Sequence, residues 1–233
     1  MEHIKNVKGV YERRMTLSQK RDVPEAVIRR LPRYHRYLGE LLRRGVLRIS
    51  SSELSEHMQV TASQIRQDLN CFGGFGQQGY GYHVQRLYDR ISELLGASEG
   101  YSAVFVGLGH LGFSLVSSAM LERRGIQKLA IFEKNPSLIG TTVAGLPVLD
   151  VDNLEEWCAN KNVTIGILAV PKEEANLCAA ALARAGVRGI WNFSDTELDL
   201  VIPGVLVENM HLSDALLDLC YRLRCEAQTK KEV

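Results

Sequence analysis

A chain of 233 residues with a hydrophobic fraction of 45% is long enough for one large domain or two small ones with packed cores. Its net charge of +1 is unevenly spread, because residues 1–48 carry thirteen Lys and Arg against five Asp and Glu, whereas residues 100–233 carry twelve against sixteen; this asymmetry indicates that the N-terminal end meets a polyanion. No apolar run approaches the roughly 20 residues that span a bilayer, and the first residues lack the apolar core of a signal peptide, so we expect a cytoplasmic protein with no membrane partner.

The first part of the chain is predicted to form a tail and a helix. Residues 1–22 are polar and basic with little periodicity, as in a flexible or weakly helical tail. From about Pro24 to Arg44 the pattern is helical, with an interruption near Pro32 and an end at Gly45. This helix gives the next segment a basic flank.

Residues 49–72 have the anatomy of a helix-turn-helix. Ser50 and Glu53 have capping-box spacing at the start of one short helix, and Thr61 and Gln64 repeat it at the start of a second. In the second helix, one stripe at i, i+4 and i+7 is predicted to be buried, namely Ile65, Leu69 and Phe72. The opposite face carries residue types that hydrogen-bond to bases and phosphates, namely Ser63, Gln64, Arg66, Gln67 and Asn70.

The next stretch, residues 73–82, alternates glycines with Phe75, Tyr80 and Tyr82. This pattern favours a β-hairpin wing whose tip, with Gly76 and Gln78, approaches the DNA backbone. For any one helix pair, the alternative to DNA binding is that the two helices simply pack against each other. Together the caps, the polar face, the wing and the basic flank favour a winged helix DNA-binding domain over residues 23–96, followed by a linker at 96–100.

Residues 101–210 alternate strands and helices. The predicted strands are the apolar runs at 103–106, 129–133, 164–170 and 189–193, and the predicted helices lie at about 110–124, 152–160 and 173–185. Such alternation predicts an α/β domain with a Rossmann-like, doubly wound parallel sheet.

The glycine motif of that domain, VGLGHLG, follows a predicted strand and opens a predicted helix. Gly107 permits the tight turn, Gly109 lets the backbone approach a pyrophosphate, and Gly112 lets helix and strand pack closely. We assign the intervening His110 and Leu111 to the same cofactor site, where His110 contacts phosphate or solvent. The motif predicts dinucleotide binding.

An acidic residue, Glu133, ends the next strand 21 positions after Gly112. Its carboxylate is expected to accept hydrogen bonds from the adenosine ribose and to repel a 2′-phosphate, so NAD(H) is favoured over NADP(H), although Lys134 beside it weakens that preference. Val170 and Pro171 are expected at the rim of the nicotinamide half. The alternative is a Rossmann-like domain without a ligand.

Catalysis is not expected. Only about 40 residues follow the Rossmann-like pattern, and they contain one histidine, His211, so a substrate domain with a proton-transfer group is missing. The five cysteines are scattered without a CxxC pair, which indicates neither a disulfide framework nor a metal site.

From about Val23 to Arg224, the chain resembles the Rex family of redox-sensing transcriptional repressors. The resemblance is carried by VPEAVIRRLPRYHRYL, ISSSELSEHM, VTASQIRQDLNCFGGFG, VGLGHLG, GILAVPKEEA and AGVRGIWNF. It implies a homodimer whose winged helices bind double-stranded AT-rich palindromic operators. It also implies a Rossmann domain that senses NADH against NAD⁺ without turning it over.

Four positions depart from the family pattern. Two DNA-contacting cations of the family are amides here, Gln67 and Gln78, which implies a changed operator preference or a flatter salt dependence. His211 stands where many members have an acidic residue that pairs with the arginine matching Arg36, and Ser118 stands at an aromatic position. The coupling between NADH and DNA is therefore expected to run through other contacts.

The C-terminal helix, residues 211–226, is broadly apolar, with Leu216 and Leu223 among its leucines. The resemblance implies that it is a dimerisation helix that swaps into the partner subunit. The alternative is a last helix folded back on its own sheet. Two other functions stay open beside an NADH-responsive repressor: a small NAD-dependent oxidoreductase, and a repressor of the same fold that has lost redox sensing.

Overall fold

The computed structural model describes residues 23–71, 73, 76–77, 80–97, 99–198 and 204–229. It divides into two compact units between Gly96 and Ala97, inside the stretch predicted as a linker. The predicted basic tail, residues 1–22, lies outside the described residues, as do Phe72, Phe75 and Gln78 of the predicted stripe and wing.

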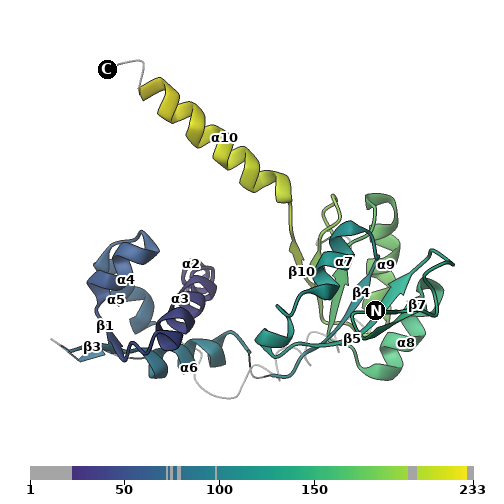
Figure 1. Cartoon of the computed structure of the whole chain (residues 1–233), viewed down its shortest axis with the longest axis horizontal. Helices are drawn as coiled ribbons and strands as arrows, with labels where there is room; N and C mark the ends of the chain where they lie inside the picture. Colours follow the sequence, from purple (N-terminus) through teal and green to yellow (C-terminus); the bar gives the residue numbers. More distant parts are fainter. Residues whose placement is uncertain are drawn as a thin grey trace, which may run out of the picture. The chain divides into compact units, whose positions relative to one another are not determined.

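The first unit has the predicted winged helix architecture (Figure 1). Its elements are α2 (Glu25–Ile28), α3 (Leu31–Arg43), β1 (Arg48–Ile49), α4 (Ser51–Met58), α5 (Ala62–Asn70), β2 (Gly76–Gln77), β3 (Gly81–His83) and α6 (Val84–Leu94). The three strands form an antiparallel sheet in the order β1-β3-β2, and α3 packs against α6 and α4 against α5. The interruption expected near Pro32 is the break between α2 and α3, with Pro32 in the first turn of α3.

The two predicted capping boxes differ in the structure. At α4 the box is complete, because Ser50 Oγ accepts from Glu53 N at 3.1 Å and Glu53 accepts from Ser50 N at 2.7 Å. At α5 only half forms: Thr61 Oγ1 accepts from Gln64 N, but the Gln64 amide donates to Asp68 Oδ1 at 2.8 Å. The prediction of a complete second capping box was therefore wrong, because the Gln64 side chain binds the buried carboxylate of Asp68, one turn later, instead of the backbone N–H of Thr61.

The second unit is built on a sheet of seven strands in the order β10-β9-β8-β4-β5-β7-β6. The strands are β4 (Ser102–Val106), β5 (Gln127–Glu133), β6 (Thr142–Val143), β7 (Leu146–Asp150), β8 (Ile165–Leu168), β9 (Gly189–Asn192) and β10 (Leu206–Asn209). All neighbouring strands are parallel except the edge pair β6 and β7. This is the predicted doubly wound sheet, and the strand order reverses between β4 and β8, where such sheets bind ligands.

Helices cover both faces of this sheet. On one face Val104, Val106 and Phe132 pack against α8 (Leu154–Lys161) and α9 (Lys172–Arg184). On the other face Phe105 and Ile131 pack against α7 (His110–Ser117). Alternate residues of β4 thus face opposite layers, as the strand period of two requires.

The structure differs from the sequence prediction at three places in this unit. The helix predicted at 110–124 ends at Ser117, because Ser118 is extended and its Oγ accepts from Met120 N at 3.2 Å, a local turn that competes with the helix. A short 3₁₀ turn, η1 (Glu122–Arg124), follows. The hairpin of β6 and β7 and the strand β10 were not predicted; residues 144 and 145, with φ of 49° and 79°, form the two-residue turn of that hairpin.

The last helix is α10 (Leu212–Thr229), and from Leu212 to Gln228 all its residues except the half-buried Cys225 are exposed. Its large apolar side chains are between 47% and 67% exposed: Leu212, Leu216, Leu217, Leu219, Tyr221 and Leu223. Among the helices of the described ranges, none is long and apolar enough to cross a membrane.

Candidate functional site

The glycine turn connects β4 to α7, and its glycines meet different constraints. Gly107 has φ of +94°, and a Cβ there would lie 2.5 Å from the Ala169 carbonyl oxygen. A Cβ on Gly112 would collide with the Gly107 carbonyl oxygen, so Gly112 allows α7 to pack on the turn. Gly109, the N-cap of α7, has only open space beside it. The turn is therefore crowded at Gly107 and Gly112 and open beside Gly109, where a pyrophosphate could approach the N-terminus of α7.

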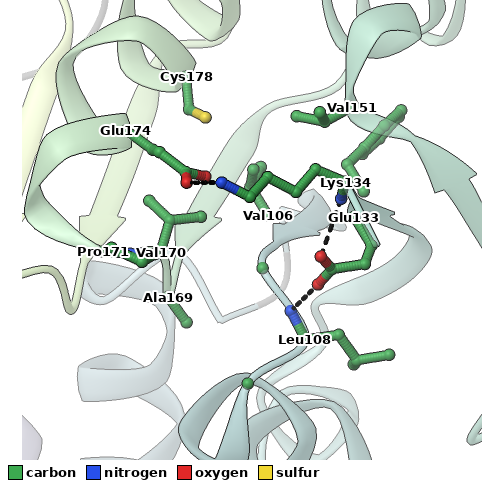
Figure 2. A pocket seen from close by; sticks show the side chains of 13 residues that line it. Val106, Leu108, Glu133, Lys134, Val151, Ala169, Val170, Pro171, Glu174 and Cys178 are labelled. Carbon is green, nitrogen blue, oxygen red and sulfur yellow. Dashed lines mark hydrogen bonds and ion pairs between the residues drawn. The ribbon is translucent and has the colours of Figure 1, made fainter. Parts of the chain in front are cut away.

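Glu133 ties this turn to the end of β5. Its carboxylate accepts three backbone N–H groups, from Leu108 at 2.7 Å, Lys134 at 2.8 Å and Asn135 at 3.0 Å, and Figure 2 shows the first two. The first of these bonds crosses from one strand end to the next. Glu133 therefore shapes the turn itself, a role that sequence spacing does not reveal.

A cavity of about 210 Å³ opens beside the turn at the carboxyl ends of β4, β5 and β8. Its lining is Val106, Gly107, Leu108, Gly109, Phe132, Glu133, Lys134, Val151, Ala169, Val170, Pro171, Glu174 and Cys178. The structure thus brings six of the predicted cofactor residues together, while His110, Leu111 and Gly112 lie on α7 outside the lining.

The lining residues that sequence reasoning did not assign to the cofactor site include Leu108, Val151, Ala169 and Cys178. Val151 follows β7, which was itself not predicted, and Cys178 lies two turns into α9. Burial raises the pKa of the Cys178 thiol, so it lines the cavity as a neutral, apolar group. The signal that could have found Val151 is its place directly after a strand, at the same sheet edge as Glu133.

The candidate DNA-binding face lies on α5. Ser63, Arg66, Gln67 and Asn70 are exposed, whereas Ile65 and Leu69 on the opposite side are fully buried. Arg66 Nη1 donates to Ser51 Oγ at 3.2 Å, which links the two helices of the motif. Gly76 lies in the hairpin strand β2, and Gln78 lies outside the described residues.

A buried carboxylate of α5 itself, Asp68, was not anticipated as a structural residue. It is 0% exposed and accepts a bidentate pair from Arg30 at 2.7 and 2.8 Å, the Tyr34 hydroxyl at 2.9 Å and the Gln64 amide at 2.8 Å. These bonds join α5 to the start of α3, so Asp68 fixes the placement of the candidate recognition helix.

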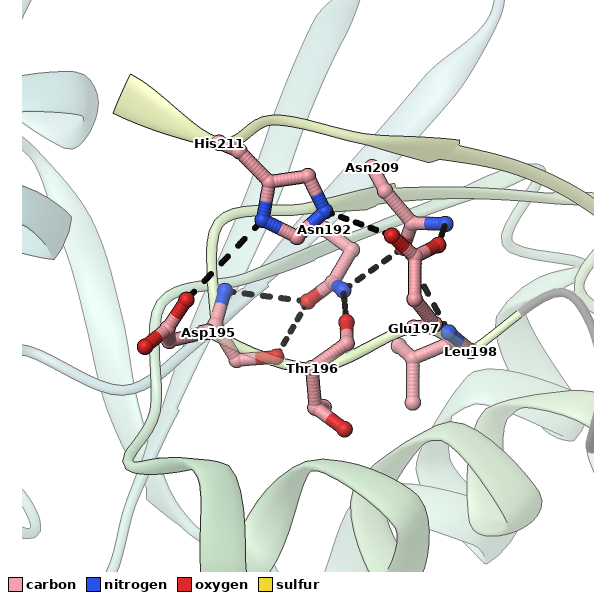
Figure 3. Close-up of polar contacts among 8 residues, drawn as sticks. Asn192, Asp195, Thr196, Glu197, Leu198, Asn209 and His211 are labelled. Atoms are coloured by element: carbon pink, nitrogen blue, oxygen red, sulfur yellow. Dashed lines mark hydrogen bonds and ion pairs between the residues drawn. The ribbon is translucent and has the colours of Figure 1, made fainter. Parts of the chain in front are cut away.

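The root of α10 is held by a polar network (Figure 3). Asn192, fully buried at the end of β9, donates to Asn209 Oδ1 at 2.8 Å and to the Thr196 carbonyl at 2.7 Å. Asn209 in turn donates to Glu197 Oε2 at 2.8 Å, and Glu197 Oε1 lies 2.8 Å from His211 Nε2. The network therefore ties the loop after β9 to the residue that precedes α10.

His211 is the predicted switch residue. It is not acidic itself, but two carboxylates lie close to it. Besides Glu197, Asp195 Oδ1 lies 3.9 Å from His211 Nδ1. Arg36, the other predicted switch residue, is exposed on α3 in the first unit. Acidic groups from the loop after β9 thus lie beside His211.

Comparison with protein families gives two matches. Residues 22–70 match the family described as putative DNA-binding protein N-terminus. Residues 98–196 match the family described as CoA binding domain. The two matches fall in the two units of the structure.

Curated relatives match nearly the whole chain. A redox-sensing transcriptional repressor Rex of Thermoanaerobacter pseudethanolicus is 50% identical over 216 residues, which cover 92% of this chain and 96% of the relative. The repressor of the same name from Clostridium beijerinckii is 49% identical over 208 residues, or 89% of this chain and 98% of the relative.

Solved structures of similar proteins also match nearly the whole chain. A crystal structure of RSP in complex with β-NAD⁺ and operator DNA is similar with a TM-score of 0.82 at 50% identity, covering 90% of this chain and 96% of that one. RSP in complex with β-NADH is similar with a TM-score of 0.83 at 46% identity, covering 91% and 99%.

Proposed function

Because this chain belongs to the Rex family of redox-sensing transcriptional repressors, we propose that it binds operator DNA through its first unit and leaves the operator when NADH enters the cavity beside the glycine turn. The observation that carries the proposal is the carboxylate of Glu133 fixed on the glycine turn, at the edge of a cavity at the sheet's switch point. The relatives are repressors by name, so the chain is a regulator and not an enzyme. A repressor acts on chromosomal DNA, which supports a place in the cytoplasm.

For the ligand, we propose that the pyrophosphate lies over Gly107 and Gly109 at the N-terminus of α7, beside His110 and Leu111. Glu133 would then face the adenosine ribose, with Lys134 next to it, and Val170 and Pro171 would border the nicotinamide half. Gly112 acts indirectly by allowing the close packing of α7.

For DNA, we propose that α5 enters the major groove with Ser63, Arg66, Gln67 and Asn70, and that Gln64 contributes its amide oxygen while its nitrogen stays on Asp68. The amides of Gln67 and Asn70 are suited to adenine, which supports an AT-rich operator. The wing, with Gly76 and Gln78, would contact the backbone.

We further propose a homodimer formed through α10, which supports a palindromic operator. We expect the double variant Leu216→Glu/Leu223→Glu to weaken self-association by more than about thirtyfold, since each leucine buried at an interface contributes about 1.5–3 kcal/mol. Light scattering after size exclusion, over a dilution series, measures the change. Arg222→Glu is the control, because it adds the same side chain beside Asp218, about 110° around the helix from the two leucines; a monomer from the control alone would argue against this interface.

The functional test is fluorescence anisotropy of a labelled AT-rich palindromic duplex, titrated separately with NADH, NAD⁺ and NADPH. We expect NADH to release the duplex, NAD⁺ to oppose that release and NADPH to have no effect. A hundredfold loss of DNA affinity corresponds to a coupling free energy of about 2.7 kcal/mol. DNA binding that ignores all three nucleotides would contradict the proposed sensor.

One observation favours a second candidate, a repressor of this fold that no longer senses redox state. His211 is hydrogen-bonded to Glu197, and Ser118 caps a local turn. Both positions, which belong to the family's switch, therefore make contacts other than those that the family pattern implies. In that case the duplex titration would show binding without release.

A further inference from the structure

Lys134 and Glu174 form an ion pair at the edge of the cavity. Lys134 follows Glu133 in the loop after β5, and Glu174 lies in the first turn of α9. Figure 2 shows the two side chains extending toward each other from opposite sides of the pocket, where Lys134 Nζ donates to Glu174 Oε1. Both residues also line a neighbouring hollow of about 410 Å³ between α8 and α9. The pair therefore stands between the two spaces.

Three charges gather at this edge, and each is already engaged. The Glu133 carboxylate is held by backbone N–H groups, including that of Leu108 in the turn. The Lys134 ammonium is held by Glu174, and this contact raises the pKa of Lys134, so the lysine is charged at neutral pH. Two carboxylates and one ammonium leave one negative charge in excess. An incoming phosphate would meet this excess and a lysine that is already paired.

We propose that Glu174 is a specificity-determining residue that keeps Lys134 from serving a 2′-phosphate, so that the site takes NAD(H) and rejects NADP(H). The inference rests on the proposed dinucleotide site. The residue that ends the second strand of the fold faces the adenosine ribose. Lys134 comes directly after it, and its long stem lets the ammonium turn toward a phosphate on that ribose once its partner is removed.

Exposure sets the strength of this effect. The Lys134 side chain is 65% exposed and that of Glu174 is 31% exposed, so the pair is partly screened by solvent. A 2′-phosphate carries more negative charge than one carboxylate and accepts stronger hydrogen bonds from an ammonium. Removal of Glu174 should therefore change the preference between the two dinucleotides measurably without creating a strict NADP site, because Glu133 stays in place.

The test compares NADH and NADPH binding to the full-length protein, followed by nicotinamide fluorescence, which is the same reporter in both ligands. We expect Glu174→Gln to tighten NADPH binding by roughly five- to tenfold and to change NADH binding by less than about threefold. The gain should disappear in the double variant Lys134→Gln/Glu174→Gln, and it should shrink in high salt.

Glu173→Gln is the matched control. It removes the same charge one position earlier in α9, from an exposed side chain that is not part of the cavity lining, and we expect the NADPH to NADH ratio to stay within about twofold of the wild type. An unchanged ratio in Glu174→Gln, with NADH still bound, would overturn the inference and leave the proposed function standing. An equal gain in Glu173→Gln would overturn it as well, since net charge alone would then explain the effect. If the wild-type protein binds no NADH, the proposed function falls and the inference falls with it.

Discussion

Replacement of Glu133 by alanine is expected to weaken NADH binding by at least about thirtyfold, because a hydrogen bond to a charged group contributes about 1.5–3 kcal/mol and the variant can make none to the ribose. The loss has two sources: the contact to the ribose and the support of the glycine turn through Leu108. Isothermal titration with NADH measures it. Operator binding without nucleotide should stay within about threefold of the wild type, since the two functions belong to separate units.

Two further variants sharpen this result. Glu133→Gln keeps one acceptor oxygen and should bind NADH with an intermediate affinity. Glu173→Ala, an exposed carboxylate on α9, should bind like the wild type. Loss of operator binding in Glu133→Ala, with the fold intact by circular dichroism, would contradict the division of labour between the units.

Asp68→Asn is expected to destabilise the first unit by about 3–5 kcal/mol, because it leaves the Arg30 guanidinium facing a neutral amide in a buried network. Operator affinity should fall with it, since α5 loses its link to α3. Both tryptophans, Trp157 and Trp191, lie in the second unit, so urea unfolding must be followed by far-UV circular dichroism to see the first one. Glu25→Gln, which removes an exposed ion pair with Arg29, is the matched control and should leave the transition unchanged.

The same carboxylate makes the first unit sensitive to acid. Burial raises the pKa of Asp68, but hydrogen bonds from Arg30, Gln64 and Tyr34 and the charge of Arg30 outweigh burial and hold that pKa below its usual value. The folded pKa is thus lower than the unfolded one, so the stabilisation is complete above the unfolded value of about 3.8 and is lost as pH falls through the folded value. We expect this acid-dependent part of the stability to be absent in Asp68→Asn; an identical acid profile would show that other groups cause it.

Much of the fold could be predicted because its signals are local. The central strands β4, β5, β8 and β9 are apolar runs, and the cap of α4 is complete within four residues. The hairpin of β6 and β7 lies at the sheet edge, contains Pro147 and is only partly buried, so it carries no such run.

Residues of the site could be predicted only where they belong to a motif with a fixed spacing along the sequence. The three glycines and Glu133 follow a fixed spacing, whereas Glu174 reaches Lys134 across 40 positions and Arg30 reaches Asp68 across 38. Such partners are chosen by the folded geometry. The capping box predicted for Gln64 failed for the same reason, because Asp68 is held in place from a distant helix.

The polar network holds α10 at its N-terminal end, next to the sheet, so a change of orientation there would displace the rest of the helix. The helix has 18 residues and therefore extends about 27 Å at a rise of about 1.5 Å per residue. A tilt of about 10° at Asn209 and His211 would move the far end by about 5 Å, which exceeds the rise of a single base pair, about 3.4 Å. Asn192 and Glu197 hold the pivot by hydrogen bonds to these two residues. A small rearrangement in the loop after β9 would therefore displace the far end of α10 by more than the rise of one base pair.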